Sequence, residues 1–421
     1  MSTEFVPAAE VRPVTFAVRA NDHIGRGHRR GEELRTGIAS TVEAYRRYFA
    51  HLSITEAAVE SAAVSSWQRL QQWWPTGAEE VEAVAAGARI GVTELMEIVA
   101  RTEIMTQAEA APTECSTVSH TSPGASVAAQ NWDWAADFST LWHFNDVGSV
   151  PGQHRHVGIA EFGMLGKIGL NEAGVGVLLN ILKHTGDTAG GVPIHMILAR
   201  VLAEAGSLAE ALEIIDSAPT SSSSIITVIT AEAAVQVEIA GELKRERRVR
   251  AVHGTDGETG ESGFLIHTNH FLHPDLLDGA LELRPDSTSQ ERYRHLAEAV
   301  VRFEAERVLA RGGEAPAGGA AHADGAAESD SAVHTGGAAE SDGAASTDGA
   351  KNAPVTVGDL TKLLTTGPGD APVCCTPAPG AAYGNRSATL VSVRIDPVRK
   401  QIDLAPGSPA DGLHGNRRFQ L

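Results

Sequence analysis

The chain changes character at residues 112–118, which read PTECSTV: helical sequence ends at Pro112 and strand sequence begins at Cys115. Ser116 and Thr117 keep the surroundings of the cysteine small and polar, as access to a reactive centre requires. A cut before Cys115 would give one residue both a thiol and a free α-amino group, whose ordinary pKa of ~7.7–8.0 suits a base at neutral pH. The alternative is a small buried hydrophobe, the commoner state of cysteine. The segment predicts a nucleophile at the head of a strand.

Helices are predicted before this segment, over residues 32–111. Apolar residues recur every three or four positions along the first helix, which builds one buried face. A second helix is predicted from Thr55 to Trp74, with Pro75 as its stop, and a third from Thr93 to Ala111. The apolar face of the first helix comprises Leu34, Ile38, Val42, Tyr45 and Phe49.

Short strands separated by glycines are predicted after this segment, interrupted by helices at 193–205, 208–218 and 289–310. Runs of strands broken by helix pairs favour an α+β or layered sandwich over a strictly alternating arrangement. The predicted strands are 116–120, 126–130, 156–162, 167–170, 175–180, 224–230, 234–240, 247–252, 264–267, 388–395 and 400–404.

Residues 312–350 differ in composition from the rest of the chain. They contain no Lys, Arg or aromatic residue, and GAAESD occurs at 325–330 and again at 337–342. Such a stretch cannot bury enough apolar area to offset its ordering entropy, so it is predicted to be a disordered, acidic Gly/Ala-rich insertion. It supplies seven of the nineteen net negative charges.

The composition of the chain limits its possible partners and location. The 53 acidic residues outnumber the 34 basic ones, which argues against nucleic acid or an anionic membrane as a partner. The first residues lack a basic and apolar leader, and no run of roughly eighteen apolar residues occurs, so neither a secretory signal nor a membrane span is expected. Three cysteines cannot form a disulfide framework, and the expected location is the cytoplasm.

Asp133 follows Cys115 closely, within the stretch QNWDW at 130–134. Its carboxylate could hydrogen-bond the α-ammonium of Cys115 and orient it, as a third group does in catalytic triads. The alternative is an Asx turn between two strands, which the flanking tryptophans disfavour because tryptophan usually buries most of its area.

Three further residues are candidates for the same chemistry. The side-chain amide of Asn269 could stabilise a tetrahedral intermediate as an oxyanion donor. Asn180 ends an apolar strand, from which its backbone N–H could point into a site. Arg386 precedes a strand near the C-terminus and could pair with Asp133 or with a substrate carboxylate, unless it is a surface charge.

A histidine metal site is the competing interpretation of HTNHFLH at 267–273. The spacing of His267, His270 and His273 does not place all three imidazoles on one face of a strand, and no matching group of ligands follows. No metal is therefore expected.

Taken in order, these motifs resemble those of the acyl-coenzyme A:6-aminopenicillanic acid acyltransferase (isopenicillin N acyltransferase) family of N-terminal-nucleophile hydrolases. The resemblance covers most of the chain from around residue 30, apart from 312–350. It rests on Cys115, QNWD at 130–133, KIGLNEAGV at 167–175, GVP at 191–193, HTNH at 267–270 and RSATL at 386–390.

The resemblance implies an α+β fold, a four-layer αββα sandwich, made as an inactive precursor. Cleavage between Glu114 and Cys115 would give a helical α-subunit of residues 1–114 and a β-subunit of residues 115–421 that stay associated. The founding member of the family is cut after glycine, so the acidic Glu114 is a departure that could slow the N→S acyl shift.

The resemblance also implies the roles of the site residues. Cys115 would be the nucleophile, Asp133 would orient its amine, and Asn269 with the backbone N–H of Asn180 would form the oxyanion hole. Arg386 would line the site.

The expected reaction is attack of Cys115 on an amide or thioester carbonyl, followed by transfer of the acyl group to water or to an amine. The partners are then a small-molecule acyl donor and acceptor, with β-lactams, N-acyl amines and amino-acid conjugates all open. No cofactor is expected, acyl-coenzyme A being a candidate substrate, and self-association is left open. The alternatives are an unprocessed binding protein and a histidine metallohydrolase.

Overall fold

A computed structural model describes residues 6–108, 115–122, 124–249, 251–253, 259–283, 285–310, 353–378 and 380–421. Two sequence-based predictions lie outside these residues. Glu114, on the N-terminal side of the predicted cut, is one of them, and the predicted insertion at 312–350 is the other.

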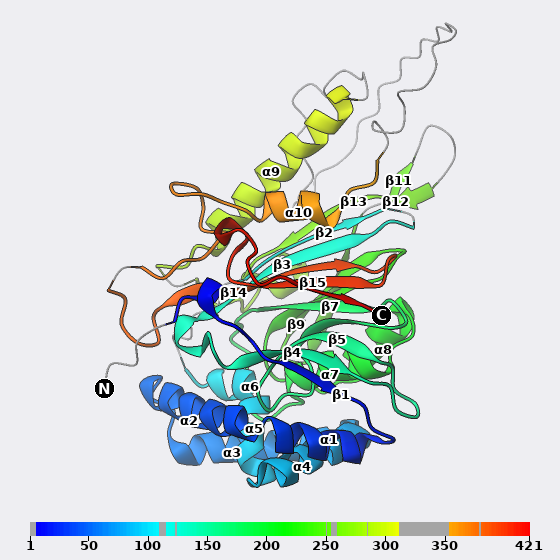
Figure 1. Ribbon diagram of the computed structural model, residues 1–421. Helices are drawn as coiled ribbons and strands as arrows, with labels where there is room; N and C mark the ends of the chain where they lie inside the picture. The colour runs from blue at the N-terminus through cyan, green and yellow to red at the C-terminus, as the bar shows by residue number, and fades with distance from the viewer. Residues whose placement is uncertain are drawn as a thin grey trace, which may run out of the picture.

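Two large β-sheets form the centre of the protein (Figure 1). All neighbouring strands within them are antiparallel except β1 and β4, which are parallel. The first sheet has the order β1 (Thr15–Val18), β4 (Trp142–Val147), β5 (His156–Glu161), β6 (Ile168–Asn171), β7 (Gly176–Ile181), β8 (Ser224–Ile229), β9 (Ala234–Ala240) and β10 (Leu243–Arg248). The second has the order β13 (Gly263–His267), β2 (Cys115–Thr121), β3 (Val127–Ala135), β14 (Ser387–Asp396), β15 (Gln401–Pro406) and β16 (Arg417–Gln420).

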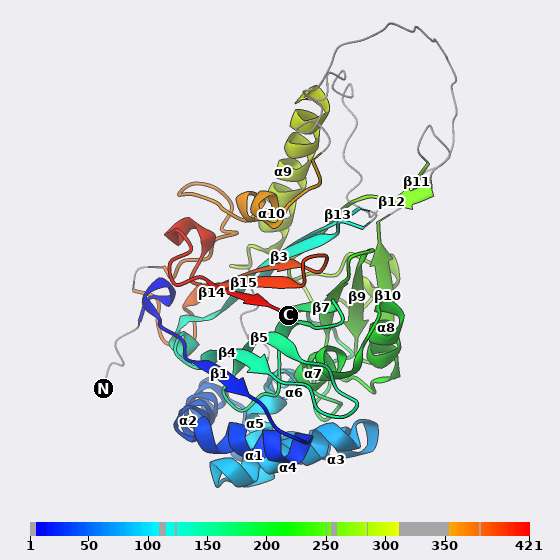
Figure 2. The same cartoon turned by 45° about the vertical axis from the view of Figure 1, so that its right-hand side comes forward.

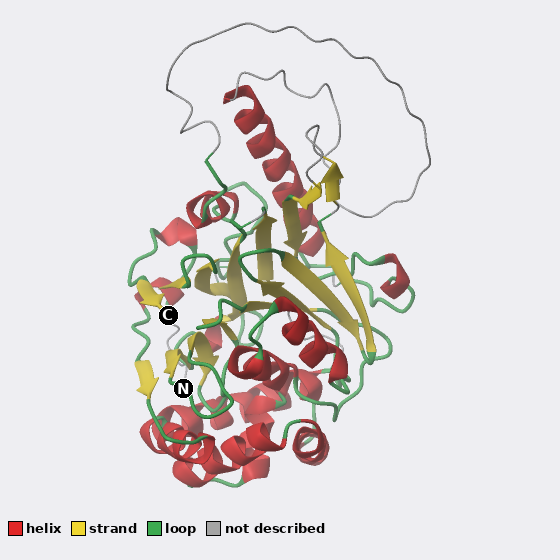
Figure 3. Ribbon diagram, turned by 90° about the vertical axis from the view of Figure 1, so that its right-hand side faces the viewer, coloured by secondary structure: helices red, strands yellow, loops and turns green. Residues whose placement is uncertain are grey.

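Helices cover the outer face of each sheet, as Figure 3 shows with helices in red and strands in yellow. Helices α7 (Ile194–Glu204) and α8 (Leu208–Ser217) share one apolar cluster with strands β7, β8 and β9. Helices α9 (Ser289–Ala310) and α10 (Val357–Leu363) share another with β2, β3 and β13. The predicted α+β class and four-layer αββα order are therefore confirmed.

The N-terminal helices pack together beside the first sheet, at the bottom of Figures 1 and 2. Helices α1 and α4 approach closely because Gly31 and Gly87 carry no side chain: a Cβ at Gly31 would lie 2.0 Å from the carbonyl oxygen of Val84. The bounds are α1 His23–Glu33, α2 Arg35–His51, α3 Glu56–Trp73, α4 Pro75–Ala88, α5 Val92–Val99 and α6 Arg101–Met105.

The end predicted for the second helix is confirmed: α3 ends at Trp73, and Pro75 begins the next helix, α4, where its missing N–H has no helical partner to lose. The third predicted helix is wrong in two details. The predicted helix from Thr93 to Ala111 is two helices, α5 and α6, which meet at Ala100. Thr93, the predicted N-cap of that helix, lies inside α5, whose N-cap is Gly91. Thr55, where the second helix was predicted to begin, is the N-cap of α3, because its side chain accepts a hydrogen bond from the N–H of Ala58.

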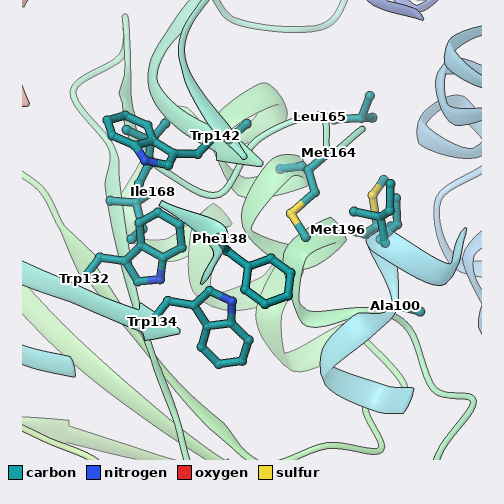
Figure 4. Packing of buried hydrophobic residues seen from close by; sticks show 14 of the residues in the cluster. Ala100, Trp132, Trp134, Phe138, Trp142, Met164, Leu165, Ile168 and Met196 are labelled. Atoms are coloured by element: carbon teal, nitrogen blue, oxygen red, sulfur yellow. The ribbon is translucent and has the colours of Figure 1, made fainter. Parts of the chain in front are cut away.

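One apolar cluster lies between the sheets and extends into the N-terminal helices. Alternation along β3 turns Trp132 and Trp134 to this inner face, where Figure 4 shows them beside Trp142 and Phe138. Tyr45 and Phe49 of α2 belong to the same cluster. The residues on the two sides of the predicted cut therefore share one core.

No helix among the described residues combines the length and the apolar character needed to cross a bilayer.

A buried ion pair holds α1 against α4, and its loss is expected to be costly. Arg26 forms two hydrogen bonds with Glu80, of 2.8 and 2.6 Å, and both side chains are only 2% exposed. We expect Glu80→Ala to lower the free energy of unfolding by about 3–5 kcal/mol, because it leaves the Arg26 charge buried without its partner. Urea unfolding followed by circular dichroism measures the change.

The neighbouring residue gives the matched control. Glu79 pairs with His23 at 2.7 Å, but its side chain is 57% exposed, so Glu79→Ala should cost about 1 kcal/mol or less. Equal losses in the two variants would contradict this account of the buried pair.

Candidate active site

Cys115 begins strand β2, as predicted, and its side chain is buried at 5% exposure. It lies directly opposite Trp132 on β3, and opposite residues of an antiparallel pair project from the same face, so both side chains enter the space between the sheets. There Cys115 faces a small cavity of about 20 Å³, room for roughly one water molecule. The cavity is also lined by Arg101, Trp132, Asp133, Trp134, Lys167, Leu179, Ile181 and Asn269.

Asn269 holds the backbone nitrogen of Cys115. The N–H donates to Asn269 Oδ1 at 2.7 Å, and this nitrogen would become the α-amine after a cut. Asn269 reaches this place because it follows β13, which pairs with β2 at His267 and Thr117. Its Nδ2 donates to the carbonyl oxygen of Ile181 at 3.0 Å. These contacts favour a role for Asn269 as the hydrogen-bond acceptor of the Cys115 nitrogen. The oxyanion role that the resemblance implies for Asn269 stays a prediction.

Asn180 reaches across from the first sheet to the second. Its Nδ2 donates to the carbonyl oxygens of Cys115 and His267, at 3.2 and 3.3 Å. Its Oδ1 accepts from Thr117 Oγ1 at 2.7 Å and from Gln130 Nε2 at 3.1 Å. The Asn180 side chain thus holds the start of β2 both as a donor, to Cys115, and as an acceptor, from Thr117. The oxyanion role of the Asn180 backbone N–H stays a prediction.

Asp133 lies inside β3 and is buried, so the alternative of an Asx turn is wrong. Its backbone carbonyl oxygen lies 3.7 Å from Cys115 Sγ. Burial, and then the negative charge of Asp133, raise the pKa of the Cys115 thiol to about 12 in the intact chain. The thiol is thus protonated at neutral pH and needs a base. The predicted contact between the Asp133 carboxylate and the amine stays a prediction.

Arg292, which was not a candidate from the sequence, contacts Cys115 from helix α9. Arg292 of α9 is fully buried, and its Nη1 donates to the carbonyl oxygen of Cys115 at 2.7 Å and to Ser116 Oγ at 2.9 Å. Its Nη2 donates to Asn269 Oδ1 at 3.0 Å. Arg386, the arginine chosen from the sequence, instead pairs with Asp137 at 3.2 Å and does not line the cavity at Cys115.

A second group that the sequence left without a role is Lys167, in the KIGLN stretch. Its Nζ lies 2.8 Å from Glu161 Oε2 and 3.7 Å from the centre of the Trp132 ring. Glu161 also accepts two hydrogen bonds from Arg101, of 3.1 and 2.8 Å, and one from the hydroxyl of Tyr45. The only sequence signal for this cluster of Lys167, Glu161, Arg101 and Tyr45 was a lysine directly before the predominantly apolar strand β6.

A larger cavity, of about 340 Å³, lies beside the small one at Cys115. Trp134 and Ile181 line both cavities, so the two are neighbours. Apolar side chains, including Met105, Leu182 and Leu281, line it together with polar groups at residues 183–187 and 222–223. Its size and mixed lining suit a small organic ligand.

The three histidines of the 267–273 stretch have protein partners. His267 Nε2 lies 3.0 Å from Glu238 Oε1, His270 Nδ1 lies 2.8 Å from Ser289 Oγ, and His273 Nδ1 accepts from the N–H of Asp275 at 3.2 Å. In the part of the chain that the structure describes, no three His, Cys, Asp or Glu side chains are grouped so as to hold a metal ion.

Comparison with known proteins places this site in context. The family model described as acyl-coenzyme A:6-aminopenicillanic acid acyl-transferase matches residues 120–311. The acyl-coenzyme A:6-aminopenicillanic-acid-acyltransferase 40 kDa form of Emericella nidulans is 30% identical over 259 residues, which is 60% of this chain and 68% of that protein.

Two solved structures also match. Penicillin V acylase from Agrobacterium tumefaciens is 12% identical with a TM-score of 0.33, over 69% of this chain and 82% of that one. A variant of conjugated bile acid hydrolase from Clostridium perfringens is 11% identical with a TM-score of 0.38, over 72% and 96%.

The two arginines can be distinguished experimentally. Arg292→Ala removes three buried, charge-assisted hydrogen bonds around Cys115, so we expect a loss on the order of 3 kcal/mol in the free energy of unfolding. Arg386→Ala removes a partly exposed ion pair and should cost about 1 kcal/mol or less. Chemical unfolding of both variants checks the difference. Arg302→Ala is the control, because Arg302 lies on the same helix with 60% of its side chain exposed.

Proposed function

Since the chain belongs to the acyl-coenzyme A:6-aminopenicillanic acid acyltransferase family, we propose that it is an N-terminal-cysteine amidohydrolase or acyltransferase with Cys115 as its nucleophile. The family model and the Emericella relative are both named for acyl transfer. An acyl group held on the enzyme can pass to an amine or to water, so transferase and hydrolase chemistry differ only in the acceptor.

The observation that carries the proposal is the hydrogen bond from the Cys115 nitrogen to Asn269 Oδ1, beside the cavity that the thiol faces. The thiol has its pKa raised to about 12 by burial and by Asp133, and no histidine is among the residues that line the cavity. A free α-amine on Cys115 would supply the missing base, and Asn269 already holds its nitrogen in place. The positive charge of nearby Arg292 would favour the neutral, proton-accepting form of that amine.

Self-cleavage would release this amine. In the proposed step Cys115 Sγ attacks the carbonyl carbon of Glu114, the C–N bond to Cys115 breaks, and the nitrogen takes up a proton. Water then hydrolyses the resulting thioester, which frees the carboxylate of Glu114 and restores the thiol. Residues 1–114 and 115–421 would stay together, because residues before and after the cut share the apolar cluster between the sheets.

Turnover would use the same atoms. The amine accepts the thiol proton while Sγ attacks the carbonyl carbon of an amide or thioester, and the leaving group takes that proton when the intermediate collapses. The acyl group would extend into the cavity of about 340 Å³, whose apolar side chains suit a hydrocarbon or aromatic group. The substrate classes to screen are β-lactam amides, N-acyl amines, amino-acid conjugates and acyl-coenzyme A thioesters. The proposed location of the reaction is the reducing cytoplasm.

Replacement of Cys115 tests the proposed nucleophile. Wild-type protein should run as fragments of 114 and 307 residues with the α-amine of Cys115 exposed, and Cys115→Ala should remain one uncut chain of 421 residues without turnover. Electrophoresis with intact-mass measurement checks the cleavage. Cys374→Ala is the matched control, because Cys374 is a half-buried thiol elsewhere in the fold, and it should be cut normally.

Two results would reject the proposal. An uncut wild-type chain whose Cys115 resists alkylation would leave a binding protein as the function. Activity that survives Cys115→Ala but is lost on treatment with a chelator would favour metal-dependent hydrolysis instead.

A bulky substitution tests the proposed acyl cavity. Thr106 lines it, so Thr106→Phe should reduce the space and lower kcat/KM for bulky acyl amides by about tenfold, which corresponds to 1–2 kcal/mol. Alkylation of Cys115 by iodoacetamide should not change. Gln107→Phe is the control on the next, exposed residue, and a similar loss there would show that the cavity does not hold the acyl group.

A further inference from the structure

Lys167 lies in the nucleophile cavity and has no part in the chemistry described above. It precedes strand β6, is 1% exposed, and places Nζ on the face of the Trp132 ring at 3.7 Å from the ring centre. Trp132 is the cross-strand partner of Cys115, and all three residues line the same cavity of about 20 Å³. The lysine therefore shares with the thiol a space that holds a single oxygen-sized group.

Two features fix the ammonium group in this position. Glu161 Oε2 accepts a hydrogen bond from Nζ at 2.8 Å, and the aromatic ring attracts the positive charge. Glu161 also accepts hydrogen bonds from Arg101 and Tyr45, which fix its carboxylate in place. Burial would raise the pKa of Glu161, but the charges of Arg101 and Lys167 outweigh it and hold that pKa well below its ordinary value.

Basic side chains gather at the cavity. Arg101 and Lys167 line it, and Arg292 donates to the carbonyl oxygen of Cys115 beside it. The acidic side chains there are Asp133, which lines the cavity, and Glu161, which accepts from Arg101 and Lys167. Protonated, these basic groups would attract a negative charge that develops on a substrate oxygen in the cavity.

The asparagines beside Cys115 use most of their side-chain amide hydrogens within the protein. Asn180 Nδ2 donates to the carbonyls of Cys115 and His267, and Asn269 Nδ2 donates one of its two hydrogens to the Ile181 carbonyl. Nζ of Lys167 carries three hydrogens, and the hydrogen bond to Glu161 uses one of them. Lys167 is therefore the charged donor best placed to receive an oxyanion.

We propose that Lys167 is a further catalytic residue, whose ammonium stabilises the oxyanion of the tetrahedral intermediate formed on Cys115; this rests on the proposed function. As the Sγ–C bond forms, the π electron pair of the carbonyl moves to oxygen beside Nζ, and the thiol proton moves to the α-amine. On collapse the carbonyl re-forms, the bond to the leaving group breaks, and the leaving group takes the proton from the α-ammonium. Lys167 keeps its three protons throughout.

Two reactions of Cys115 separate this role from any other. Acylation by p-nitrophenyl hexanoate passes through an oxyanion, whereas alkylation by iodoacetamide does not. In processed Lys167→Met, acylation should slow by about 10²-fold or more, as when an oxyanion donor is removed, while alkylation changes much less. Equal losses in both reactions, or none in either, would overturn the proposal. Lys244→Met is the matched control, because Lys244 is a part-buried lysine on the edge strand β10.

Lys167→Arg keeps the test valid if the Met variant does not fold or process. Burial lowers the pKa of Lys167 to about 7 against the opposing charge of Glu161, and the protonated form is the active one, so acylation is lost as pH rises through that pKa. Arginine stays charged, so this loss should move to higher pH. The other titratable groups around Lys167 (Arg101, Asp133, Glu161, Cys115 and His195) are unchanged in the variant. An unmoved loss would overturn the proposal.

Failure of this inference is distinguishable from failure of the proposed function. Cys115→Ala that still releases p-nitrophenolate at the wild-type rate would reject Cys115 as the nucleophile. An inactive Cys115→Ala together with a fully active Lys167→Met would reject only the role of Lys167.

Discussion

The carboxylate of Glu161 is the contact on which the arrangement around Cys115 depends. It lies at the end of β5 and binds Tyr45 of α2, Arg101 of α6 and Lys167 before β6, so it connects the N-terminal helices to the central sheets. A buried carboxylate that is shared by several donors defines their positions more sharply than apolar packing does. The helices before the nucleophile thus help to build its cavity, since Arg101 lines it.

The sequence predicted the elements with strong periodicity and missed those without it. Helix α9 and strand β9 have the bounds expected from their patterns. Helix α1 was missed because HIGRGHRRGEE contains three glycines and no apolar stripe; its fold depends on the close packing against α4 that glycine permits. Strand β4 was also missed: its residues WHFNDV begin with an alternation of apolar and polar types, but Asn145 and Asp146 break it and are depleted in strands.

The candidate site shows the same division. Cys115, Asp133, Asn180 and Asn269 were chosen from local motifs, and the fold brings all four together. Three lie on or just after neighbouring strands of the second sheet, and Asn180 reaches them from β7 of the first. Arg292 was not found, since it is one of several arginines in α9 and lies 177 residues from Cys115. Lys167 was visible in a motif but had no role until its neighbours Glu161 and Trp132 were known. Contacts between distant segments are what a single sequence lacks.

The core shared across the predicted cut has a consequence for folding. Before cleavage the N-terminal helices and the sheets fold as parts of one chain, at the high effective concentration that a covalent link provides. After cleavage the same contacts would join two molecules, so recovery from denaturation would become bimolecular and would depend on protein concentration. The mature protein would then be protected chiefly by the slowness of its unfolding, and a heated sample would lose structure that its precursor could regain.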